Sequence, residues 1–80
     1  KNIDFSVIED YFIEKKDSYY LTELMSVVLD DIDFKKLIKK ILEVNDENFI
    51  KDCYKRIKEL NLISDDDLKK YGFDIEKYNN

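Results

Sequence analysis

Residues 45–63 read NDENFIKDCYKRIKELNLI and form the longest uninterrupted helical pattern in the chain. Apolar side chains recur here with a period near 3.6 and cover an arc of roughly 140°, the width of a stripe that faces a protein core. The stripe consists of Phe49, Ile50, Cys53, Tyr54, Ile57 and Leu60. Lysines occupy the opposite side, so this stretch predicts an amphipathic helix against which the other segments pack.

The ends of this helix carry recognisable signals. Asn45 is a favourable N-cap residue, and Val44 and Phe49 have the spacing of a hydrophobic staple around it. At the other end, Asn61 suits the left-handed conformation that follows a helix, and Leu62 can then fold back on the last turns. We therefore expect the helix to begin after Asn45 and to stop at Asn61.

A first helix is expected to begin after Asp4 or Ser6 and to end near Glu14. Asp4 as N-cap would place Ile3 and Ile8 at staple spacing, whereas Ser6 would form a capping box with the glutamate three residues later. The two residues cannot both be the N-cap, so the start stays open between them. The side of this helix that is expected to face the core consists of Phe5, Val7, Ile8, Tyr11 and Phe12.

Two further helices are expected before Asn45. One runs from Ser18 or Thr22 to Asp30 and should be buried on most sides, because its apolar positions cover close to half of the circumference. These positions are Tyr20, Leu21, Leu24, Met25, Val27, Val28 and Leu29. The next begins after Asp33, a good N-cap, and carries the stripe Phe34, Leu37, Ile38, Ile41 and Leu42. Its short connection to the following helix favours an antiparallel pair.

The C-terminal segment contains a shorter helix. Ser64 is a good N-cap, and the acidic residues 65–67 suit the positive end of a helix dipole. Gly72 suits the left-handed position that ends a helix. Asp74 can cap one more turn at residues 75–78.

The composition supports a helical fold. The chain has one glycine and no proline, so it lacks the turn residues that a β fold of 80 residues would need. Residues 1–80 are expected to form a single helical domain. We predict an all-α fold, a compact bundle of four main helices plus a short fifth C-terminal helix.

The location of the protein is inferred from its cysteine and its apolar runs. Cys53 is the only cysteine, so the chain cannot form an internal disulfide and does not need an oxidising compartment. No signal peptide and no apolar run long enough for a membrane span is visible. We expect an intracellular, cytoplasmic protein with no membrane association.

Enzyme chemistry finds little support. The chain has no histidine, which removes the commonest general base and the commonest ligand of catalytic zinc. Cys53 lies on an apolar stripe and is expected to be a small buried hydrophobic residue. The acidic clusters Asp30, Asp31 and Asp33 and residues 65–67 are explained by helix capping. We predict a protein that is not an enzyme, with no cofactor, no metal and no small-molecule substrate.

The charge is distributed unevenly along the chain. Residues 1–33 carry nine acidic and three basic side chains, whereas residues 34–63 carry five acidic and eight basic ones. The first part also holds several tyrosines, which are favoured at protein interfaces. The leading hypothesis is a protein-binding module or small acidic inhibitor that acts on a larger, basic protein, including one that handles nucleic acid. The candidate interface residues are Glu9, Asp10, Tyr11, Glu14, Tyr19, Tyr20 and Glu23.

An alternative hypothesis uses the basic middle of the chain. A helix-turn-helix-like nucleic-acid binder could contact phosphates through the lysines of the third and fourth helices. The candidate residues are Lys35, Lys36, Lys39, Lys40, Lys51, Lys55 and Lys58. Arg56 is the only arginine of the chain, and the outward positions lack the Asn, Gln and Ser side chains that read base edges. Nucleic acid is therefore the less favoured partner.

Overall fold

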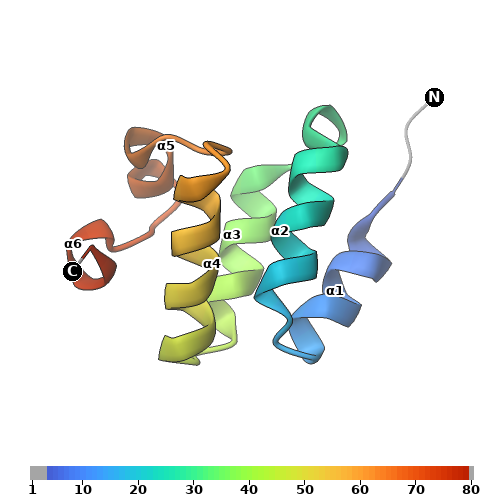
Figure 1. The fold of residues 1–80 in the computed structure, drawn as a ribbon, viewed down its shortest axis with the longest axis horizontal. Coiled ribbons are helices and arrows are strands. Elements are labelled where there is room, and N and C mark those ends of the chain that lie inside the picture. The colour runs from blue at the N-terminus through green and yellow to red at the C-terminus, as the bar shows by residue number, and fades with distance from the viewer. Residues whose placement is uncertain (1–3, 80) are drawn as a thin grey trace.

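The structure is a computed structural model that describes residues 4–79. Within them the chain forms α-helices and one short 3₁₀ segment and has no β-strand, so the predicted all-α bundle is confirmed. The elements are α1 (Ser6–Glu14), α2 (Ser18–Val27), η1 (Leu29–Asp31), α3 (Phe34–Glu43), α4 (Glu47–Glu59), α5 (Asp65–Lys70) and α6 (Ile75–Tyr78). In Figure 1, α1, α2 and α4 stand side by side, α3 lies behind α2 and α4, and the short helices α5 and α6 lie at the end opposite α1.

One hydrophobic core joins the four longer helices and the two short ones. Its fully buried side chains come from α2, α3, α4 and α5, and they are Leu21, Met25, Leu37, Ile38, Ile41, Cys53, Ile57 and Leu68. The stripes predicted for α3 and α4 supply most of them. The helix α2 packs closely on α4 with one side and on α1 with another. It is therefore the central element of the bundle.

The predicted helix caps and stops are largely confirmed. The side chains of Asp33, Ser64 and Asp74 each accept a hydrogen bond from a backbone N–H three residues later. Asn61 has a φ of 58° and Gly72 has a φ of 92°. In both cases the next residue donates its N–H back into the last helical turn, over 3.0 Å for Leu62 to Ile57 and 2.9 Å for Phe73 to Leu68. Local sequence alone determines these ends.

The predicted start of α4 was wrong by one residue. Asn45 has a φ of 59° and forms the left-handed turn between α3 and α4. Asp46 is the N-cap instead, and its carboxylate accepts hydrogen bonds from the N–H groups of Asn48 and Phe49 at 3.1 Å. Asparagine adopts the left-handed conformation readily, and an aspartate carboxylate accepts hydrogen bonds from the first N–H groups of a helix. Asn45 therefore makes the turn and Asp46 caps the helix.

The ends of the first two helices also differ from the prediction. Helix α1 starts at Ser6 without a side-chain cap, and the Asp4 carboxylate only accepts a hydrogen bond from the Ser6 N–H at 2.9 Å. The proposed staple involves Ile3, which lies outside the described residues. Helix α2 has Asp17 as its N-cap and ends at Val27, before the predicted end at Asp30. Asp30, expected to end the helix, and Asp31, expected in the following turn, both belong to η1.

The core-facing side predicted for α1 was wrong in part: Phe12 packs against the core, but three of the other predicted positions are exposed. Val7 is 77% exposed, Tyr11 is 56% exposed and Ile8 is 45% exposed, whereas Glu9 is buried. The helix docks with Glu9 toward Lys40 of α3, which rotates much of its apolar arc out of the core. The second helix was likewise expected to be buried on most sides, but three of its predicted apolar positions are exposed: Tyr20 and Val27 of α2, and Leu29, which lies in η1.

Helices α3 and α4 run in opposite directions, as predicted (Figure 1). The closest packing partner of α4 is nevertheless α2. Among residues 4–79, none of the helices is both long enough and apolar enough to cross a membrane.

Candidate protein-binding face

The exposed large apolar side chains of residues 4–79 are concentrated on the N-terminal elements of the bundle. Within residues 4–79, every large hydrophobic side chain that is exposed belongs to α1, α2 or η1. We call this set the α1–α2 face, and it comprises Val7, Ile8, Tyr11, Tyr19, Tyr20, Val27 and Leu29. Single exposed hydrophobic residues are ordinary, but a concentration of them marks an interaction site.

Four aromatic rings connect α1 and α2 across this face. The rings of Tyr11 and Phe12 meet edge to face with centroids 5.7 Å apart. The Phe12 ring stacks on Tyr20 with centroids 6.0 Å apart, and Tyr20 meets Tyr19 edge to face at 5.2 Å. All three distances fall in the range of favourable aromatic pairs. We call Tyr11, Phe12, Tyr20 and Tyr19, in this spatial order, the aromatic row.

A cation covers each end of the aromatic row. The guanidinium carbon of Arg56, on α4, lies 4.5 Å from the centroid of the Tyr19 ring. The ammonium of Lys15 lies 5.7 Å from the centroid of the Tyr11 ring. Arg56 also donates hydrogen bonds to Glu23 and to the hydroxyl of Thr22. These contacts fix the row to three helices, and Tyr20 remains 56% exposed in its middle.

A tight turn between α1 and α2 places the rings. Lys16 has a φ of 55° and ends α1 in a left-handed conformation. Asp17 then donates its N–H to the carbonyl of Phe12 over 2.9 Å, while its carboxylate accepts from the N–H of Tyr20 at 3.0 Å. One residue thus closes α1 and caps α2. The chain reverses direction here, which sets Phe12 beside Tyr20.

The acidic side chains predicted for this interface take different positions. Glu9 and Asp10 accept hydrogen bonds from Lys40 at 3.0 and 2.8 Å. Burial by itself would lower the pKa of Lys40, but the hydrogen bonds to the two carboxylates outweigh it, so that pKa is raised. Glu23 pairs with Arg56, whereas Glu14 is exposed. The structure therefore brings the three predicted tyrosines together and engages most of the predicted acids within the molecule.

Comparisons of the chain with protein-family models, with curated proteins and with solved structures found no match.

Val7, Ile8 and Val27 belong to the face and were expected in the core. One signal in the sequence could have revealed them. The apolar residues of α1 spread over more than half of its circumference, and a short helix at the edge of a bundle can bury only one side. The surplus apolar positions of an edge helix are therefore candidates for an interface.

The lysines of the alternative hypothesis are divided by the fold. Lys40 binds the carboxylates of α1, and Lys58 pairs with Asp65 of α5 over 2.8 Å. The remaining candidates are exposed on two helices, of which α3 lies behind α4 in Figure 1. They are Lys35, Lys36, Lys39, Lys51 and Lys55.

Two surface hollows accompany the bundle. One, of about 440 Å³, lies between α4, α5 and α6, and its polar groups Lys58 and Asp65 pair with each other. The other, of about 300 Å³, lies where α1, η1 and α3 meet and contains both carboxylates and lysines. Residues 4–79 contain no group of three or more His, Cys, Asp or Glu side chains arranged to hold a metal ion. Cys53 is buried, and desolvation raises the pKa of its thiol to about 12.

Proposed function

We propose that this chain is a non-enzymatic protein-binding module that engages a larger partner through the α1–α2 face. The observation that carries the proposal is the confinement of the exposed large hydrophobic side chains of residues 4–79 to α1, α2 and η1. The aromatic row adds four rigid rings, three of which are tyrosines with a polar hydroxyl group, the kind of side chain that is enriched at interface centres.

The energetic scale of the face suits reversible association. Full burial of one aliphatic or aromatic side chain contributes about 1.5–3 kcal/mol. Seven side chains that are about half exposed therefore offer roughly 5–10 kcal/mol when a partner covers them. Association itself costs about 4–15 kcal/mol. Apolar burial alone thus barely offsets the cost, and polar or charged contacts must supply the surplus that makes the complex form.

Partner capture with matched variants tests the proposal. Ile8→Ser with Val27→Ser removes exposed apolar area from the face without changing the net charge. Lys51→Glu changes an exposed side chain of α4 and is the control. We expect at least one protein from the source cell to be retained by the wild type and by the control and to be lost with the double variant. Thermal unfolding of all three proteins verifies that each is folded.

Two results would contradict the proposal. One is an identical set of captured proteins for the wild type and the double variant. The other is tight binding of duplex DNA at about 50 mM salt that disappears when Lys35, Lys39 and Lys55 are changed to Glu, which would favour the nucleic-acid alternative instead.

A further inference from the structure

The charge around the α1–α2 face is strongly negative. Residues 4–33 contain nine carboxylates and the two lysines Lys15 and Lys16. Lys36, Lys40 and Arg56 reach into this region from α3 and α4. Nine carboxylates and five cations leave an excess of four negative charges. A partner that covers the face must therefore bring positive charge or keep its own negative charge away.

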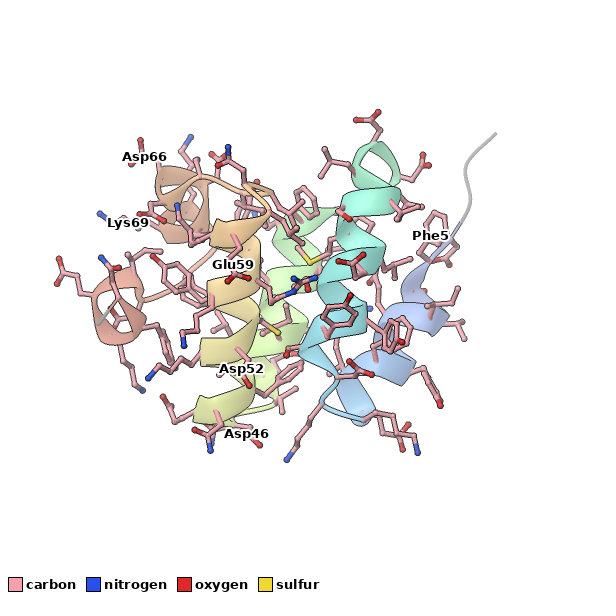
Figure 2. All side chains as sticks on the ribbon, in the orientation of Figure 1. Phe5, Asp46, Asp52, Glu59, Asp66 and Lys69 are labelled. Carbon is pink, nitrogen blue, oxygen red and sulfur yellow. The ribbon has the colours of Figure 1, made fainter. Side chains whose placement is uncertain are left out.

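The acidic surroundings continue beyond α1 and α2 onto α4. Glu59 Oε1 lies 3.9 Å from Arg56 Nη1, the same guanidinium that covers Tyr19. Figure 2 shows Asp52 and Glu59 along the side of α4 that is turned toward the viewer. Both acids are exposed. The Tyr19 end of the aromatic row, which Arg56 of α4 covers, therefore has the Glu59 carboxylate nearby.

The aromatic row already binds cations within the molecule. The Arg56 guanidinium lies over the Tyr19 ring and also donates a hydrogen bond to the Glu23 carboxylate. An aromatic ring beside a carboxylate is a favourable setting for Arg or Lys, because the ring face and the acid both attract positive charge. Tyr20 and Tyr19 are about equally exposed, and the same face has the exposed aliphatic side chains Val7, Ile8, Val27 and Leu29. This combination suits a segment with both apolar and basic side chains.

We infer that the segment which binds the α1–α2 face is a basic amphipathic helix of another protein. This inference rests on the proposed function and names the chemistry of the partner. The exposed apolar side chains lie on two neighbouring helices, and an amphipathic helix is an element that covers such an elongated surface with its apolar side. A second copy of this chain fits poorly, since a twofold dimer would place the negative excess of one face against that of the other.

Selection from an unbiased library of random 16-residue peptides tests the inference. The wild-type domain is the bait, and peptides that also bind the Ile8→Ser/Val27→Ser variant are removed. We expect the enriched peptides to carry net positive charge and apolar residues at i, i+3 or i+4, and i+7. Their affinity should fall as the salt concentration rises.

A charge-reversed pair of variants supplies the control. Glu14→Lys changes an exposed acid of α1, and Glu76→Lys makes the same change on α6, at the other end of the molecule. We expect the first to weaken binding of a selected peptide by about threefold to tenfold and the second to leave it unchanged.

The possible failures are distinguishable. Enriched peptides that are neutral or acidic, yet need Ile8 and Val27, would overturn the inference and leave the proposed function standing. A dimer in analytical ultracentrifugation that dissociates in the Ile8→Ser/Val27→Ser variant would overturn it in favour of a second copy. Absence of any peptide that depends on Ile8 and Val27 would contradict the proposed function itself.

Discussion

Arg56 of α4 donates a hydrogen bond from Nε to the hydroxyl oxygen of Thr22 on α2 over 3.1 Å, and Thr22 is fully buried. The hydroxyl lies 2.7 Å from the carbonyl oxygen of Ser18, to which it can donate its proton. Thr22 therefore accepts from one helix while it donates within its own. This contact ties the two helices of the bundle that pack most closely.

Thr22→Val keeps the shape of the side chain and removes the acceptor. We expect a loss of about 1–2 kcal/mol of unfolding free energy, because the Arg56 Nε–H is left partly buried without its partner. For a domain of this size each kcal/mol lowers the melting temperature by about 4–8 °C. Urea and thermal unfolding measure both quantities. Ser26→Ala, which removes an exposed hydroxyl of the same helix, should change stability by less than about 0.5 kcal/mol.

The second prediction concerns the attachment of α1. Lys40→Met removes the ammonium that binds Glu9 and Asp10, and the Glu9 side chain is only 9% exposed. We expect a loss of about 1–3 kcal/mol, because a carboxylate stays in a nearly buried position without a cation. Urea unfolding followed by far-ultraviolet circular dichroism measures it.

Lys39→Met is the matched control for this substitution, since Lys39 is exposed on the same helix. It should leave the unfolding free energy nearly unchanged. The double variant Glu9→Leu/Lys40→Met should recover most of the lost stability, because an apolar pair replaces the ion pair. A double variant as unstable as Lys40→Met would show that the loss does not come from the unpaired Glu9 carboxylate.

The third prediction is a loss of stability in acid. Hydrogen bonds from Lys77 and from the Tyr78 hydroxyl, together with the charge of Lys77, hold the pKa of Glu47 below its ordinary value of about 4.5. Folding therefore lowers this pKa, so the contribution of Glu47 is fully present above about pH 4.5 and is lost as the pH falls through the folded value. The pKa of Asp46 is also lowered, mainly by its hydrogen bond with Lys16, so Asp46 likewise loses its stabilising contribution in acid.

Unfolding in urea between pH 7 and pH 3 measures this dependence. Glu47→Gln should lower stability at pH 7 and flatten the decrease in acid, because the variant has no proton to gain at this position. Glu76→Gln should follow the wild type. A Glu47→Gln profile that falls as steeply as the wild type would assign the acid sensitivity to other carboxylates.

The fourth prediction concerns the thiol of Cys53. Burial raises its pKa to about 12, and the charge of Asp52 adds to the effect. Only the thiolate reacts with thiol reagents, and its population near neutral pH is about a thousandfold smaller than for a cysteine with the ordinary pKa of about 9. We expect no labelling by a disulfide reagent in the native protein and rapid labelling of one thiol in denaturant. Fast labelling under native conditions would show that α4 opens readily.

Several features of the fold follow from short stretches of sequence. The left-handed stops at Asn61 and Gly72 and the caps at Asp33, Ser64 and Asp74 depend on backbone geometry within one turn, so residue type predicts them. The apolar stripes of α3 and α4 are likewise predicted from the sequence of each helix alone.

The orientation of α1 could not be predicted in this way. In this orientation Glu9 contacts Lys40, which is 31 residues away in the sequence. The engagement of Glu23 by Arg56 is likewise a contact between distant residues, 33 positions apart. Helical periodicity identifies which residues share a face, but it does not say which face a neighbouring helix will cover. The sequence suggested Tyr11, Tyr19 and Tyr20 as interface residues from their type and position, whereas the contact of Phe12 with Tyr20 depends on how α1 packs on α2.

The aromatic row crosses the boundary between α1 and α2, since the Phe12 ring of one helix stacks on the Tyr20 ring of the other. A ligand that spans the row can bind only those molecules in which α1 is docked. Thermodynamic linkage then makes the ligand oppose the local opening of α1, by about 2.7 kcal/mol when its concentration is a hundred times the dissociation constant. Occupancy of the face would therefore slow amide hydrogen exchange in α1.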